Sequence, residues 1–328
     1  MTNAEDLQRR ADELGDQLAA LADQAGSKAT RRLRSRLAVL RRDLLKAWMA
    51  LFGTVAADVT EHDQAAAFAA AAAQLLTEAM DPALVDPDAV TTAWLTAYAL
   101  GVGNAGIRAP SGLTPPQAAP PMDLQRPVTE QATRAAVGLT AAPLAAQGFI
   151  AVTVALARAE QAVQRIEATT AFELTRAAAT GVGDVARATG SQLVWIAERD
   201  ACVHCLAYAG VTTIGAVFPT GLTFGDRPLI PPGPLVGPPL HPHCRCALQV
   251  LGPSDTAVTA ALKREAKRSV LRGFSLESES QAARLRAAAR LLANGSGLPK
   301  SVEEYAGRAV RSGEFPRGRE VPTGGRRP

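Results

Sequence analysis

All four cysteines of this 328-residue chain, and three of its four histidines, fall in one window between Cys202 and Cys246. Inside that window, residues 219–242 contain eight prolines. Proline lacks the amide donor that helices and central strands need, so neither can form at that density. The window must therefore fold around a long irregular loop. We expect side chains at the two ends of the loop, rather than backbone ladders, to hold it in place.

Cys202 and Cys205 form a C-x2-C motif, and His241, Cys244 and Cys246 form H-x2-C-x-C. Structural zinc takes four tetrahedral nitrogen or sulfur ligands, commonly from two such groups separated by a loop. The spacing therefore favours a structural Zn²⁺ site. Reduced thiols in a packed core, a disulfide or redox pair, and a catalytic metal site are the alternatives. The last lacks its usual companions, because no H-x-E, P-C-x-x-C or H-E-x-x-H motif occurs.

The ligand set stays open at this level. Four cysteines would satisfy a zinc ion and leave no thiol idle, and we prefer that set. Two pairs of equal spacing are the other choice, formed by Cys202, Cys205, His241 and Cys244. We expect His204 to point away from the site, and Arg245 to offset the charge of neighbouring thiolates or to donate hydrogen bonds nearby.

Apolar residues make up 47% of the chain but aromatic residues only 4%, so the core must consist mostly of alanine, leucine and valine. This composition suits close-packed helices better than a sandwich or barrel of strands. Strand-like sequence flanks the cysteine window at residues 191–200 and 244–251. We predict a mainly α protein with a small α+β module, in which long helices surround a compact, metal-stapled domain.

Changes in pattern divide the chain into five consecutive segments. They are an N-terminal helical region over 1–107, a proline-rich linker over 108–129, an α+β domain with the cysteine–histidine cluster over 130–252, a C-terminal helix over 253–295, and a basic mobile tail over 296–328. Within the first segment, the pattern predicts a helix over 87–102 that stops at Gly101 and Gly103.

The N-terminal region has an apolar stripe and a basic face. The stripe has the alternating four- and three-residue spacing of a coiled-coil seam, at Leu7, Ala11, Leu14, Leu18, Leu21 and Ala25. It is explained equally by a coiled coil over 4–47 and by an amphipathic helix that packs on its own domain. The basic face includes Arg31, Arg32, Arg34, Arg36, Arg41 and Arg42. It is either a solvated surface or a contact for phosphates.

Charge and hydropathy exclude other classes of protein. The net charge of +4 and the pI near 9.1 are too mild to indicate nucleic-acid binding by themselves. No basic segment followed by an apolar run opens the chain, so we expect no secretory signal and few disulfides. The most apolar window, from Pro143, meets Arg158 before it reaches the roughly 20 residues that a membrane span requires. We therefore expect no membrane partner.

The sequence around the cluster resembles a known signature. "VWIAERDACVHCLAYAG" followed by "PPLHPHCRCALQVL" is similar to the pattern of the phage minor head proteins, the head-morphogenesis proteins of the Mu F-like and SPP1 gene-product-7-like group. The matching positions are Trp195, Asp200, Cys202, Cys205, Gly210, Pro239, His241, Pro242, Cys244, Arg245 and Cys246. The resemblance covers roughly residues 140–250, about a third of the chain.

This resemblance implies a low-copy structural protein of a tailed-phage head. Its implied location is the virion, in the head interior or at the portal vertex, after assembly in the host cytoplasm. The implied partners are the portal protein and other head proteins, with packaged DNA as a contact for the arginine-rich face. Its role would be head morphogenesis, with a part in DNA packaging or ejection.

Two other functions stand beside this one. A metal-dependent nuclease or hydrolase would use His241, His243 and either Asp200 or Asp226 around an open metal position, and it needs carboxylates that converge on the ion. A zinc-ribbon nucleic-acid-binding protein would bind through the cysteine module itself. Because the sequence has no Ser-His-Asp set and no convincing pair of carboxylates, we expect no enzymatic activity.

Overall fold

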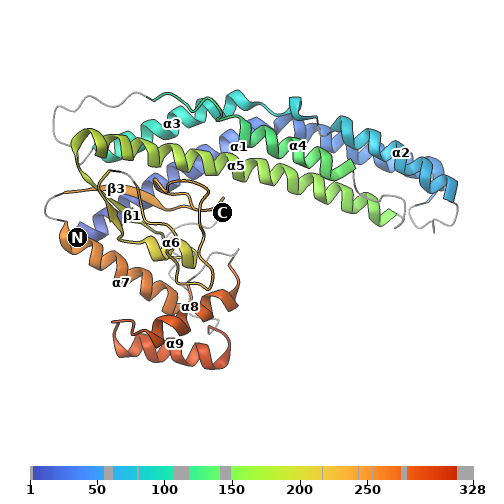
Figure 1. Cartoon of the computed structure of the whole chain (residues 1–328). Coiled ribbons are helices and arrows are strands. Elements are labelled where there is room, and N and C mark those ends of the chain that lie inside the picture. Colours follow the sequence, from blue (N-terminus) through green and yellow to red (C-terminus); the bar gives the residue numbers. More distant parts are fainter. Residues whose placement is uncertain are drawn as a thin grey trace. The chain divides into compact units, whose positions relative to one another are not determined.

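The computed structural model describes residues 3–54, 62–79, 81–106, 118–140, 149–215, 217–242, 244–252, 255–274 and 279–315 (Figure 1). The protein is mainly helical with a small antiparallel sheet, as the composition predicts. The helices are α1 (Asn3–Phe52), α2 (His62–Ala79), the short 3-10 helix η1 (Pro82–Leu84), α3 (Pro87–Gly106), α4 (Arg126–Thr140), α5 (Phe149–Thr189), α6 (Val203–Tyr208), α7 (Thr256–Arg272), α8 (Gln281–Ala293) and α9 (Lys300–Ser312). The strands are β1 (Gln192–Ile196), β2 (Thr212–Thr213) and β3 (Ala247–Leu251).

Two compact units make up the chain, and both are discontinuous in sequence, unlike the consecutive segments expected from composition. The first, which we call the cysteine unit, comprises Met1–Leu18, Thr96–Ala118 and Leu174–Pro328. The second, the helical unit, comprises Ala19–Leu95 and Ala119–Glu173. Each unit has its own cluster of buried apolar side chains.

The core of the helical unit is built on one face of α1. Leu33, Leu37, Leu40 and Leu44 are buried together there. At the end of the stripe, the Trp48 ring lies 4.2 Å from that of Phe52 and 5.0 Å from that of Phe68. Few aromatic residues are needed because alanines on α2 and α5 fill the remaining space.

The predicted stripe near the N-terminus is buried within the chain itself. Leu7, Ala11, Leu14 and Leu18 are each less than a tenth exposed, and so is Ala25. A seam for a second copy would leave these side chains open in the single chain. The structure therefore favours the amphipathic helix that packs on its own protein over the coiled coil at 4–47.

The arginine-rich face of α1 is only partly free. Arg34 makes a bidentate contact with Glu167, Arg36 pairs with Glu78, and Arg42 binds Asp43. Glu167 also accepts a hydrogen bond from the buried Thr30. Within the described part of the chain, Arg31, Arg32 and Arg41 have no ion-pair partner. The basic face thus serves partly to join α1 to α5.

The cysteine unit contains the sheet, whose strand order is β2-β1-β3 with antiparallel pairing throughout. The two strands predicted beside the cysteine window are β1 and β3, and they pair from Gln192↔Leu251 to Ile196↔Ala247. Leu193 and Trp195 of β1, with Leu248 and Val250 of β3, point into the core of the unit.

The region after the sheet corrects the sequence analysis in two places. The single helix expected over 253–295 is two helices, because α7 ends at Gly273, which takes the left-handed conformation with φ 78°. Part of the tail expected over 296–328 is folded, since α9 buries Val302, Ala306 and Ala309 against the preceding helices. Residues 316–328 lie outside the described residues.

The glycines of α3 are a third correction. The helix does not stop at Gly101 and Gly103 but continues to Gly106. Gly101 lies against the backbone of α5, where a Cβ would come within 2.1 Å of the Ala178 carbonyl oxygen. The glycine is there for a close helix contact rather than for a helix end. In the predicted linker, residues 107–117 lie outside the described residues, and α4 begins at Arg126.

Among the described residues, no helix combines the length and the apolar character that a membrane crossing demands.

Candidate metal centre

Pairing of β1 with β3 brings the two halves of the cysteine–histidine motif together. Cys246 immediately precedes Ala247, the first residue of β3, which lies opposite Ile196 at the end of β1. From Ile196 the chain runs directly into the C-x2-C turn. Cys202 is the N-cap residue of α6, and Cys205 lies inside that helix. Pairing of β1 with β3 therefore holds the two ends of the long proline-rich loop together.

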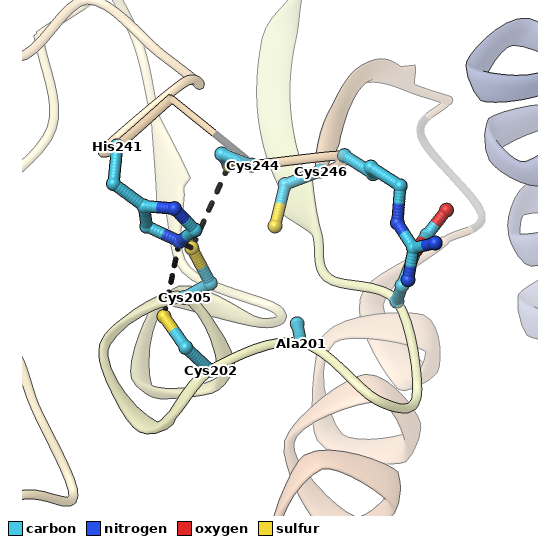
Figure 2. Close-up of a pocket in the computed structure, with 8 residues that line it drawn as sticks. Ala201, Cys202, Cys205, His241, Cys244 and Cys246 are labelled. Carbon is cyan, nitrogen blue, oxygen red and sulfur yellow. Dashed lines mark hydrogen bonds and ion pairs between the residues drawn. The ribbon is translucent and has the colours of Figure 1, made fainter. Parts of the chain in front are cut away.

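Sulfur and nitrogen atoms from both halves converge in one buried place. The Cys202 sulfur lies 3.1 Å from Nε2 of His241, and the Cys205 sulfur lies 3.3 Å from the same atom. The sulfurs of Cys205 and Cys244 are 3.5 Å apart. Figure 2 shows the imidazole of His241 pointing toward Cys202 and Cys205, with the sulfur of Cys246 on the side of Cys244.

These atoms form two triads that share Cys205. Cys202, Cys205 and His241 are one triad, and Cys205, Cys244 and Cys246 are the other; the ligand atoms of each lie within 4.8 Å of one another. A tetrahedral zinc ion, with bonds of about 2.3 Å to sulfur and 2.0 Å to nitrogen, places its ligand atoms roughly 3.5 to 3.8 Å apart. The observed separations are close to these values, so the cluster is the right size to hold a metal ion.

The disulfide alternative does not match the geometry. All four cysteines are free and buried. The 3.5 Å between the sulfurs of Cys205 and Cys244 is far longer than the ~2.05 Å of a disulfide bond. The cluster is thus a set of four thiols with one imidazole.

The thiols differ in how readily they ionise. A hydrogen bond with Cys205, aided by His241, lowers the pKa of Cys202 to about 4 despite its burial. The hydrogen bond with Cys202 raises the pKa of Cys205 well above its usual range. Burial raises the pKa of Cys244, but hydrogen bonds with Cys205 and Cys246 outweigh it, and the net pKa falls well below the usual range. The hydrogen bonds among the thiols therefore lower the pKa of some members of the cluster and raise that of others. Because metals bind the thiolate form, a cation would favour ionisation of every thiol it contacts.

One segment of the proline-rich loop lies over α6 and positions its histidine. The amide of Phe224 donates to the Val203 carbonyl oxygen at 3.1 Å. The Thr223 hydroxyl lies 2.9 Å from Nδ1 of His204, so this imidazole is engaged by the loop and not by the cysteines, as expected. His243 lies outside the described residues.

Arg245 connects the two halves of the site from the other side. Its guanidinium lies 2.6 Å from a carboxylate oxygen of Glu198, and it donates to both carboxylate oxygens of Asp200, the nearer at 2.7 Å. Burial raises the pKa of Glu198 to about 8, although Arg245 opposes the shift. Arg245 thus donates hydrogen bonds beside the thiols, which is one of the two roles expected from the sequence, and its partners are carboxylates.

Sequence reasoning missed Glu198, Glu279 and Arg284. Glu198 lines the cavity beside the cysteines. Glu279 and Arg284 contact the backbone on either side of Cys202. No local signal identifies the last two, because they lie more than 70 residues further along the chain, in a stretch with no motif.

Comparison of the chain with protein-family models gives no match. Comparisons with curated proteins and with solved structures give no match either.

Proposed function

We propose that the cysteine unit is a zinc-stapled structural module and that the protein acts in assembly of a tailed-phage head rather than as an enzyme. The proposal of a bound metal ion rests on one observation: buried thiols from both ends of the loop lie close together and close to His241. An ion at this position would close the loop and add its binding free energy to the folding of the unit. The resemblance to minor head proteins carries the assembly part.

For the ligands we propose Cys202, Cys205 and Cys244, with His241 or Cys246 as the fourth. Cys205 belongs to both triads, so Cys205→Ser should abolish stoichiometric zinc binding whichever residue completes the site. His241→Ala and Cys246→Ser then separate the two ligand sets, because only substitution of the true fourth ligand should lower the amount of zinc that the protein binds. His204→Ala is the matched control, since His204 lies in the same turn but contacts Thr223. Full-length wild-type protein purified without zinc, and unable to bind it, would refute the metal proposal.

Residues of the signature other than the metal ligands have architectural partners. Trp195 is fully buried with its ring 4.8 Å from that of Tyr208, and Asp200 binds Arg245. Gly210 has φ 71°, and a Cβ there would come within 2.4 Å of the Thr259 carbonyl oxygen. These contacts support a module in which the signature specifies packing around the centre.

The carboxylates that a hydrolase would need are already engaged. Asp200 is held by Arg245, and Asp226 is paired with both Arg286 and Arg290. These ion pairs favour a structural use of both carboxylates and so support the proposal of a structural role. A nuclease assay with and without chelator tests this. Metal-dependent cleavage that His241→Ala abolishes would refute the structural role.

The assembly role is tested by association with the portal protein encoded in the same genome. Co-expression should give a complex that survives size-exclusion chromatography, and mass spectrometry of purified virions should detect the chain at low copy number. Absence of the chain from mature heads and from head-assembly intermediates would refute the proposal.

The exposed side of α1 is the surface we propose for contact with packaged DNA. At 3.6 residues per turn, Lys28, Arg31, Arg42 and Lys46 lie opposite the leucines that face the core, and Arg32 lies on the adjoining flank of the helix. All five are exposed and span about 27 Å of helix. Such a row suits the phosphate backbone, and for each tenfold increase in salt concentration the affinity should fall by up to about 0.9 logarithmic units per phosphate contact. R31E/R32E should reduce duplex affinity in a gel-shift titration, whereas R308E/R311E, which changes the charge equally on α9, should have a much smaller effect. Equal effects would refute this surface as the DNA contact.

A further inference from the structure

The C-terminal helices reach back to the backbone that carries Cys202. Ser269 of α7 donates a hydrogen bond to the carbonyl oxygen of Arg199. Arg284 of α8 donates from Nη2 to the carbonyl oxygen of Ala201 at 2.8 Å. Glu279, just before α8, accepts a hydrogen bond from the amide of Val203 at 2.9 Å. Side chains distant in sequence therefore hold alternate residues of the turn that leads into α6.

Glu279 and Arg284 are also bound to each other, which makes them a single clamp. Nη2 of Arg284 lies 2.6 Å from a carboxylate oxygen of Glu279, and the side chains are 0% and 7% exposed. Together they contact the peptide groups on both sides of Cys202. Cys202 itself has no side-chain capping bond, and its extended backbone at φ −63° and ψ 162° directs the chain into α6. The clamp therefore supplies the polar contacts that hold this residue in position.

The charge of Arg284 is matched to the thiolates. Burial lowers the pKa of its guanidinium, and attraction to Glu279 and to Cys202 opposes that shift. Nε and Nη1 of Arg284 are buried without an acceptor in the described residues. A buried cation with unsatisfied donors is unfavourable unless negative charge lies nearby. A metal–thiolate centre carries such charge, so the buried arginine and a loaded centre are electrostatically compatible.

We propose that the Glu279–Arg284 clamp sets the metal affinity of the centre, and that metal binding and docking of α7, α8 and α9 stabilise each other. The inference rests on the proposed metal site. Groups that orient a metal ligand without touching the metal typically change affinity 10- to 100-fold when removed. Coupling between two binding events is reciprocal, so a metal that is held better by docked helices must in turn hold those helices more tightly.

The first test is zinc affinity, measured on full-length protein by competition with a chromophoric chelator. Arg284→Met removes the donor while it keeps a long apolar side chain. Glu279→Gln keeps an oxygen for the Val203 amide but removes the charge. Each should weaken zinc binding by about 10- to 100-fold. Arg264→Met, at an exposed arginine of α7, is the control and should bind as the wild type does.

The outcomes separate this inference from the metal proposal. If the wild type binds no zinc, the metal proposal itself fails. If the wild type binds zinc and the folded Glu279→Gln variant binds it equally well, the clamp is refuted while the metal site stands. Glu279→Gln decides the matter even if Arg284→Met does not fold, because it is nearly isosteric with the native side chain.

The second test needs no variant. Removal of zinc from the wild type by chelator should speed hydrogen exchange of the amides in α8, and in α6 where the ligands lie. Amides of α2, in the helical unit, serve as the internal reference and should exchange at an unchanged rate. Unchanged exchange in α8, together with faster exchange in α6, would overturn the coupling.

Discussion

The two glycines of α3 yield a pair of substitutions with opposite expected signs. Both Gly101 and Gly103 lie inside the helix, and alanine in a helix interior is favoured over glycine by about 0.8 to 1 kcal/mol. No atom lies within 4 Å of a Cβ built on Gly103, so Gly103→Ala should stabilise the protein by about that amount. At Gly101 the same gain is opposed by a clash.

The clash at Gly101 is with backbone, which cannot rotate aside. A Cβ there would lie 2.1 Å from the carbonyl oxygen and 2.9 Å from Cα of Ala178, where ordinary contact begins at 3.4 Å. The helices would have to separate by about 1 Å, and such overpacking typically costs about 1 to 3 kcal/mol or more. Gly181 of α5 lies equally close to α3, since a Cβ built there would come within 2.4 Å of the Tyr98 carbonyl oxygen, so the whole contact would open. After the propensity gain, we expect Gly101→Ala to destabilise the protein by about 2 kcal/mol.

Thermal unfolding followed by circular dichroism measures both effects. For a unit of this size, 1 kcal/mol shifts Tm by about 2 to 4 °C. Gly103→Ala should therefore raise Tm by a few degrees, and Gly101→Ala should lower it by roughly 4 to 8 °C. If Gly101→Ala is as stable as the wild type, or if both variants shift Tm in the same direction, the close-contact explanation is wrong.

Three further predictions concern the cysteine unit. The hydroxyl of Tyr98 donates to Asp184 at 2.6 Å, so Tyr98→Phe should cost about 1.5 to 3 kcal/mol in urea denaturation. Burial and this hydrogen bond raise the pKa of Tyr98. The hydrogen bond therefore contributes fully to the free energy of unfolding below the unfolded-state pKa of about 10, and this contribution is lost as pH rises further. The stability of the variant should then depend less on alkaline pH than that of the wild type. Phe315 is buried against Gly273 and its ring stacks 6.5 Å from that of Tyr305; Phe315→Ala should cost about 3 kcal/mol, and unchanged stability would restore the view that this end of the chain is a tail. Zinc bound to thiolates and neutral imidazole displaces protons, so its affinity should fall on acidification, and a pH-independent affinity in chelator competition would contradict thiolate ligation.

The strands and the cysteine–histidine cluster could be predicted from sequence because their signals are local. A C-x2-C motif beside an apolar run predicts a turn that follows a strand, and β1 and Cys202 have that arrangement. The prolines indicated a long irregular loop, and the apolar run after Cys246 indicated the strand at which this loop ends. The buried face of α1 could also be predicted, since its leucines recur with the period of a helix and are buried in the structure.

Other features could not be predicted because their cause is a distant partner. A glycine that ends a helix and a glycine that admits a neighbouring backbone look alike in sequence, as Gly101 and Gly273 show. Residues after Gly295 read as a basic tail, yet α9 is amphipathic and its apolar face is buried. Only three of its thirteen residues are buried, and they are hard to find among the charged and exposed ones when the helix is not recognised.

The amino-acid sequence by itself determined the helical class, the positions of two strands and the set of residues able to bind a metal, because spacing along the chain encodes local geometry. Only the tertiary structure decided that His241 joins the thiols, that Arg34 is tied to Glu167, and that Glu279 and Arg284 hold the backbone beside Cys202. Those contacts join residues tens to more than a hundred positions apart. They depend on how the elements pack, which no local pattern records.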